Sequence, residues 1–125
     1  MTRKYKHIVD EDQGIVTRQF KGDIYIEDIM ESWEVLLQER DLTNFQGIIH
    51  DMTDAVLKLS PDDLTQIFSL FTRHEFIFNK LKQAVVSDNP SNVVFPALAA
   101  QYNPRFRIKA FSSYEAAKNW ILYEL

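Results

Sequence analysis

Hydrophobic and polar residues alternate near the end of the chain, and the pattern then changes to a helical period. Residues 105–111 alternate as in a β-strand, and Ser112-Ser113-Tyr114-Glu115 then opens an amphipathic helix that runs to the last residue. A strand that leads directly into a capped helix is typical of an α/β unit. The end of the chain therefore predicts one strand followed by one helix.

The beginning of the chain has the pattern of a β-hairpin. Residues 5–9 and 15–20 are short runs of β-prone residues, and the polar loop 10–14 between them ends in Gly14. We therefore expect two antiparallel strands at the start.

Helical spacing of apolar residues begins at Ile26. Acidic and polar residues occupy the opposite face, and the acidic start suits the helix dipole. The pattern predicts one surface helix with these apolar positions: Ile26, Ile29, Met30, Trp33, Leu36 and Leu37.

The middle of the chain predicts a short strand and a second helix. Residues 47–50 form the apolar strand, and Asp51 to Ser60 is expected to be a loop. Ser60-Pro61-Asp62-Asp63 then supplies a cap, a proline at the first helical position and two carboxylates in the first turn. A helix should begin directly after Ser60.

A third unit follows in the same pattern. Residues 84–86 are an uninterrupted apolar run, as in a strand covered on both sides, and a helix is expected over about 91–102. Pro96 falls within that helix. We place it in the first turn, where its missing amide costs little.

The predicted order is β-β-α-β-α-β-α-β-α in a single domain over residues 1–125. Parallel strands joined through helices cross over right-handedly. We therefore expect an α/β fold with a mostly parallel central sheet, an antiparallel N-terminal edge and helices covering the sheet. Ligand sites on such sheets lie beyond the carboxyl ends of the strands. Those ends are expected at residues 50–53, 87–89 and 111–113.

Composition narrows the class of protein. With 125 residues, 46% of them hydrophobic, the chain can bury one sizeable core. The formal charge of -4 disfavours a nucleic-acid partner, and the absence of cysteine excludes disulfides and thiol chemistry. The N-terminus lacks the apolar run of a signal peptide, and no run is long enough to span a bilayer. We expect a cytoplasmic protein.

Several anchor positions, together with the element order, resemble the STAS-like superfamily: Gly22, Glu27-Asp28, Asp51-Met52-Thr53, Phe111, Glu115-Ala116-Ala117 and Trp120-Ile121. The chain looks like the small stand-alone proteins grouped with the anti-sigma-factor antagonists (SpoIIAA-like), and more distantly like the SEC14-type lipid-binding fold. The regulatory branch carries a phosphorylated serine at the start of a helix, so the resemblance implies Ser60 as a possible phosphosite. The branch's serine-glycine signature is absent here, and Pro61 follows directly, which favours a helix cap.

Residue types along the chain also suggest two other functions. A response-regulator receiver would use these residues: Asp10, Glu11, Asp12, Asp51, Ser87 and Lys109. A receiver needs a helix, a strand and a helix between its acidic cluster and its phospho-acceptor. Here residues 14–22 alternate as a strand and leave room for only one helix before Asp51, so a receiver is less favoured. His50 and Asp51, with Asp54 or His74, match no metal-ligand spacing. We expect no metal, no cofactor and no catalytic residues.

The second helix carries two apolar stripes. The first should bury against the sheet, and the second is either deeper core or an exposed band for a partner, a second copy or an apolar ligand. Phe76 falls on the polar side, which indicates that the helix ends early or that something covers this residue. The stripes are Leu64, Ile67, Phe68, Phe71 and Phe78, and then Leu70, Ile77 and Leu81.

We therefore predict a non-enzymatic protein-interaction or regulatory domain that binds a protein partner or a copy of itself as a homodimer. The expected surface combines the second helix with the segment before it. The alternative is a carrier of a small apolar, lipid-like ligand of SEC14 type, with a cavity lined by Phe68, Phe71, Phe95 or Trp33. The candidate binding residues are Asp51, Thr53, Ser60, Leu70, Phe76 and Ile77.

Overall fold

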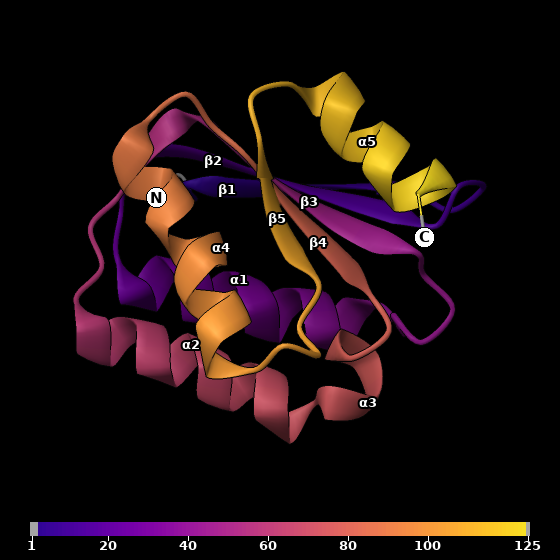
Figure 1. Cartoon of the computed structure of the whole chain (residues 1–125), viewed down its shortest axis with the longest axis horizontal. Helices are drawn as coiled ribbons and strands as arrows, with labels where there is room; N and C mark the ends of the chain where they lie inside the picture. The colour runs from indigo at the N-terminus through magenta and orange to yellow at the C-terminus, as the bar shows by residue number, and fades with distance from the viewer. Residues whose placement is uncertain (1–2, 125) are drawn as a thin grey trace.

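Five strands form one sheet in the order β1-β2-β3-β4-β5, and helices cover it (Figure 1). The computed structural model describes residues 3–124, apart from the side chains of Val93 and Ala100. The elements are β1 (Tyr5–Asp10), β2 (Ile15–Ile24), α1 (Ile26–Glu39), β3 (Gly47–Leu57), α2 (Pro61–Arg73), α3 (Glu75–Phe78), β4 (Lys82–Val86), α4 (Pro90–Tyr102), β5 (Ile108–Phe111) and α5 (Tyr114–Tyr123). The predicted single α/β domain is confirmed, and so is the element order apart from the additional short helix α3.

The first two strands form the antiparallel edge of the sheet. β1 pairs with β2 antiparallel, and β2, β3, β4 and β5 are parallel to their neighbours. Gly14 closes the hairpin loop with a φ of 70°, a conformation that glycine adopts without steric cost. The predicted hairpin and the mostly parallel sheet are both confirmed.

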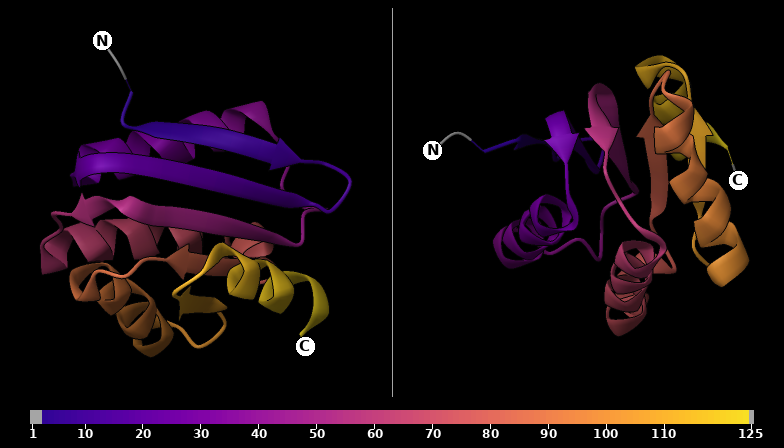
Figure 2. Two further views of the ribbon diagram at one scale, coloured as in Figure 1. Left: turned by 90° about the horizontal axis from the view of Figure 1, so that it is seen from above. Right: turned by 90° about the vertical axis from the view of Figure 1, so that its left-hand side faces the viewer.

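The helices lie on both faces of the sheet, in unequal numbers. Each right-handed crossover moves one strand further in the same direction, so α1, α2 and α4 all lie on one face. The main hydrophobic core lies between these helices and the sheet. The last helix, α5, packs on the opposite face over a smaller core. Figure 2 shows that α5 lies over the part of the sheet formed by the later strands. Ile15, at the start of β2, belongs to the core beneath α5, whereas β1 and the later part of β2 are not covered by this helix.

The third strand is longer than the sequence predicts. Most of the expected loop from Asp51 to Ser60 is part of β3, which runs alongside the equally long β2 until Ile24 pairs with Leu57. β4 pairs with β3 only as far as Asp51. Beyond that point the Asn92 side chain accepts from the Leu57 amide at 2.9 Å and donates to the Ala55 carbonyl at 2.9 Å. This side chain satisfies backbone groups that β4 is too short to reach.

Two helices also differ from expectation. α4 begins at Pro90, so Pro96 lies inside the helix and not in its first turn, which removes the hydrogen bond to the carbonyl of residue 92. α2 ends at Arg73, and the short α3 follows. Phe76 therefore belongs to α3, in agreement with the expectation of an early helix end.

Candidate functional site

Three polar side chains lie in a row beneath the helix layer. The strand register places His7 opposite Arg18 and Arg18 opposite His50, on β1, β2 and β3. All three point toward α1 because their neighbours in the alternation, such as Val16 and Ile48, belong to the main core. The sheet therefore brings a charged group and two imidazoles into an otherwise apolar layer.

Arg18 is the centre of this row. Its Nε donates to Ser32 Oγ at 3.1 Å, and its Nη2 donates to the same oxygen at 2.9 Å and to the Ile29 carbonyl at 3.5 Å. Its Nη1 donates to His50 Nδ1 at 3.0 Å. Helix α1 thus supplies oxygen acceptors, and β3 supplies an imidazole nitrogen.

These bonds fix the protonation of the two histidines. An arginine only donates, so His50 Nδ1 must accept, and its Nε2–H donates to Gln83 Oε1 at 2.8 Å. Ser32 Oγ already accepts from Arg18, so its hydroxyl proton points to His7 Nε2 at 2.8 Å. Burial, followed by the nearby Arg18 charge, lowers the pKa of His50 to about 3 and that of His7 to about 4. Both rings are neutral at pH 7.

The guanidinium carries a charge that no carboxylate balances. Arg18 is only 1% exposed, and none of the salt bridges between residues 3 and 124 involves it. Burial lowers the pKa of Arg18 to about 9, which still leaves it charged at neutral pH. Its Cζ lies 3.8 Å from the centre of the Trp33 ring and 4.9 Å from that of Phe20. These rings stabilise the cation in part, but a buried charge is normally paired.

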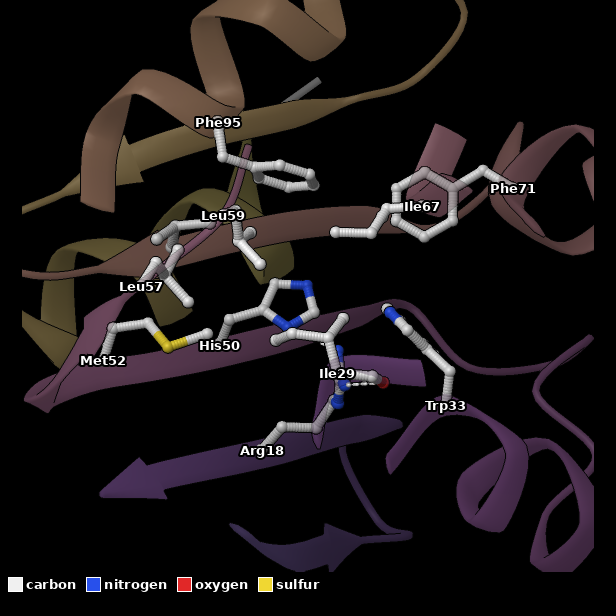
Figure 3. A pocket seen from close by; sticks show the side chains of 11 residues that line it. Arg18, Ile29, Trp33, His50, Met52, Leu57, Leu59, Ile67, Phe71 and Phe95 are labelled. Carbon is white, nitrogen blue, oxygen red and sulfur yellow. Dashed lines mark hydrogen bonds between the residues drawn. The ribbon is translucent and has the colours of Figure 1, made fainter. Parts of the chain in front are cut away.

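A small cavity adjoins this guanidinium (Figure 3). It has a volume of about 30 Å³, enough for about two water molecules. Side chains from α1, α2, α4 and the three central strands surround it, and nearly all of them are apolar. They are Arg18, Ile29, Trp33, His50, Met52, Leu57, Leu59, Ile67, Phe71, Val85 and Phe95.

A shallow, mostly apolar groove lies on the surface outside this cavity, between α2 and α4. The groove has a volume of about 300 Å³ and is lined by Pro61, Leu64, Thr65, Phe68, Leu98, Gln101 and Tyr102. Phe68 in the groove stacks on Phe95 of the cavity with ring centres 5.6 Å apart. This aromatic pair therefore lies between the surface groove and the buried cavity.

The Ser32 and His7 pair resembles a nucleophile and its base, but its surroundings do not suit catalysis. Ser32 is fully buried in α1, and its oxygen accepts two hydrogen bonds while its proton is donated to His7. A nucleophile must reach its substrate. The serine instead orients Arg18.

Two of the predicted binding residues lie on the open face of the sheet. Asp51 Oδ1 accepts from the Thr53 amide at 3.1 Å and from its hydroxyl at 2.7 Å. Both residues line a shallow polar groove with Lys21 and Lys6. His50 and Asp51 point to opposite faces because they are adjacent in β3, so they cannot share a metal ion. Within residues 3–124, no cluster of three or more potential metal ligands is found.

The other predicted binding residues lie in three separate places. Ser60 is the exposed N-cap of α2, where its Oγ accepts from the Asp63 amide at 3.2 Å. Leu70 is buried in the main core, at 3% exposure, and offers no accessible surface. Phe76 is 66% exposed on α3, and Ile77 beside it is half-buried. The six residues therefore do not form one site.

The sequence analysis missed Arg18, Ser32 and His7. A signal for Arg18 was present, because Val16, Arg18 and Phe20 share one face of β2 and both flanking positions are core residues. An arginine at a core position of a strand indicates a buried charge. The positions of His7 and Ser32 depend on strand register and helix placement, which the pattern does not specify.

Comparisons with known proteins identify the fold. No protein-family model matches the chain, and no curated protein sequence matches it significantly. The chain is similar to the crystal structure of an uncharacterized protein from the DUF3478 family with a SpoIIAA-like fold, from Shewanella loihica PV-4. The TM-score is 0.64 at 17% identity, over 94% of this chain and 91% of that chain. The protein is an α/β domain with a SpoIIAA-like fold, as the STAS-like resemblance implied.

Among residues 3–124, the helices are all too short or too polar to cross a bilayer.

Proposed function

We propose that this chain is a non-enzymatic binding domain that takes a small apolar or amphipathic molecule between its helix layer and its sheet. The cavity beneath α1, α2 and α4 is the observation that carries this proposal. Its lining is mostly apolar, with Trp33, Phe71 and Phe95, and includes one charged group, Arg18, that would fix the orientation of a ligand. Small-molecule sites commonly combine an apolar lining with a few placed polar groups.

The size of the cavity determines how such a molecule would enter. A volume of about 30 Å³ does not hold an acyl chain, but the shallow α2–α4 groove offers further apolar surface outside it. Separation of the Phe68 and Phe95 rings would join the two spaces. Pro96, directly after Phe95, removes a hydrogen bond within α4 and lowers the cost of moving this turn. The proposal therefore places the tail of the ligand along Phe95.

A neutral fluorescent probe tests this proposal. N-phenyl-1-naphthylamine should bind saturably and become brighter, and Phe95→Leu should tighten its binding because a smaller side chain widens the passage. Val94 is an exposed neighbour on the same helix, so Val94→Ala is the matched control and should change nothing. Non-saturable binding, or equal affinities in all three proteins, would refute the proposal.

Partner binding is a second proposal, supported by a different observation. Phe76 exposes 66% of its surface at the corner after α2, with Lys80 Nζ 4.3 Å from its ring centre. Aromatic side chains of this kind often anchor protein interfaces. We propose that a second copy of the chain covers this corner. Sedimentation should detect a dimer that Phe76→Glu dissociates, and a monomer at high micromolar concentration would rule it out.

A further inference from the structure

The buried network around Arg18 contains more hydrogen-bond donors than acceptors. An arginine has five N–H groups, and the four hydrogen bonds of Arg18 leave one on Nη1 unused. At the other end of the network, the buried Nε2 of Gln83 has no partner in the described part of the chain. Gln83 does not line the cavity but Arg18 does, so the group that the cavity lacks beside Arg18 is an acceptor.

A further donor faces the cavity from its helix side. Trp33 is 1% exposed, and its indole nitrogen lies at the end of the ring nearest the middle of the pocket (Figure 3). None of the hydrogen bonds found among residues 3–124 uses this nitrogen. The guanidinium and the indole thus approach the same small space from β2 and α1.

The charges around the cavity indicate which kind of acceptor a ligand would supply. The site holds one cation, and the two imidazoles in contact with the network are neutral, so a single negative charge neutralises it. A dianion such as a phosphate monoester would leave one uncompensated charge among apolar side chains, which is costly. A carboxylate only accepts hydrogen bonds, so its oxygens suit the one unused N–H of Arg18 and the indole N–H of Trp33.

We propose that the ligand of this domain is a monocarboxylic acid with an apolar tail, whose carboxylate pairs with Arg18 in the cavity. This inference rests on the proposed function, since it names the head group of the molecule that the cavity takes. The tail follows the apolar lining past Phe95 toward the α2–α4 groove. Ser32 and His50 hold the guanidinium in place, and they act as positioning residues.

The test compares two probes of equal chain length, octanoate and octan-1-ol, by calorimetric titration of the whole chain. The wild-type protein should bind octanoate at least about tenfold more tightly than octan-1-ol, as expected for a buried charged hydrogen bond. Arg18→Met should remove this preference by weakening octanoate and not octan-1-ol. Lys21→Gln removes an exposed cation from the same strand and is the matched control, with both affinities unchanged.

Each outcome supports or overturns one of the two proposals. Equal affinities of the wild-type protein for both probes would overturn the carboxylate inference and leave the apolar-ligand proposal standing. Absence of binding by either probe would overturn both. A preference for octanoate that survives Arg18→Met but is lost in Lys21→Gln would place the anion on the open face of the sheet and overturn the role of Arg18. If Arg18→Met fails to fold, equal affinities of the wild-type protein would still overturn the inference, and loss of the preference in Lys21→Gln would still place the anion on the open face.

Discussion

At the scale of single residues, Arg18 is the least expected feature of the molecule. Transfer of an unpaired charge into a protein interior costs several kcal/mol, and Trp33, Ser32 and His50 offset only part of that cost. Replacement of such a charge by an apolar side chain of similar size is often neutral or stabilising. The network is therefore better explained by binding than by stability.

The first prediction concerns the partners of this charge. Ser32→Ala leaves the guanidinium buried without its main acceptor and should lower the free energy of unfolding by about 1–3 kcal/mol. Arg18→Met combined with Ser32→Ala should recover part of that loss, because the charge that needs the acceptor is gone. Urea denaturation measures both, with the exposed Ser69→Ala as control. If the double variant is less stable than Ser32→Ala, the charge is not the source of the cost.

The second prediction follows from the pKa of His50. The pKa of the unfolded ring is near 6.5, whereas burial, followed by the Arg18 charge, lowers the pKa of the folded ring to about 3. Between these values the unfolded state binds more protons, so stability is full above pH 6.5 and falls as the pH falls. At pH 5 the loss due to His50 should be about 2 kcal/mol, by 1.36 kcal/mol per pH unit.

Denaturation at pH 7 and at pH 5 measures this loss. His50→Gln should lose less stability between the two values than the wild-type protein, and the exposed His74→Gln should behave like the wild type. His7 is linked to Arg18 by its hydrogen bond with Ser32, and its pKa is also lowered. Part of the pH dependence should therefore persist in His50→Gln. An unchanged pH dependence would show that His50 is not held neutral by the fold.

At this scale, sequence reasoning could foresee the burial of Arg18 but not its surroundings. The alternation of residues along β2 places the Arg18 side chain among core residues, and this alternation can be seen from the neighbouring residues in the sequence. Its contacts with Ser32 and His50 join residues that are far apart in the chain and depend on register. No local pattern specifies that register.

At the scale of elements, α2 is the segment whose start the sequence determines most completely. Ser60 accepts from the Asp63 amide, and Asp63 Oδ2 accepts from the Ser60 amide at 2.9 Å, so the two residues form a capping box. Residues that are close together in the sequence therefore specify the start of α2, and the predicted start is confirmed.

The third prediction concerns this cap. Ser60→Ala should cost about 1 kcal/mol in the free energy of unfolding, because the Asp63 amide loses its acceptor. Ser60→Asp should be nearly neutral, since aspartate caps equally well. Chemical denaturation compares the three proteins. If Ser60→Asp instead changes the oligomeric state and leaves the denaturation midpoint unaltered, Ser60 is a regulatory site and not only a cap.

Elements whose limits depend on distant partners could not be predicted in the same way. β3 extends past Asp51 because β2 runs beside it and because Asn92, from α4, satisfies its free edge. The polar residues after Asp51 have the composition of a loop, and only the neighbouring segments make them a strand. Pro96 is likewise accommodated within α4, although its local sequence favours a helix start.

At the scale of the whole molecule, the two faces of the sheet have different properties. Helices α1, α2 and α4 cover the face that holds Arg18 and the cavity, whereas α5 covers only part of the other (Figure 2). The chain has two tryptophans, and the sheet separates them: Trp33 lines the cavity, and Trp120 packs in the smaller core. Each tryptophan therefore reports on one face of the sheet.

These two indole groups test the central claim, a carboxylate ligand held by Arg18 in the cavity. A nitrogen–proton correlation spectrum gives one indole signal for each tryptophan and can be followed while octanoate is added. The Trp33 signal should move until the site is saturated, the Trp120 signal should stay in place, and Arg18→Met should abolish the movement. A Trp33 signal that stays in place while octanoate binds, or movement of the Trp120 signal alone, would contradict this account.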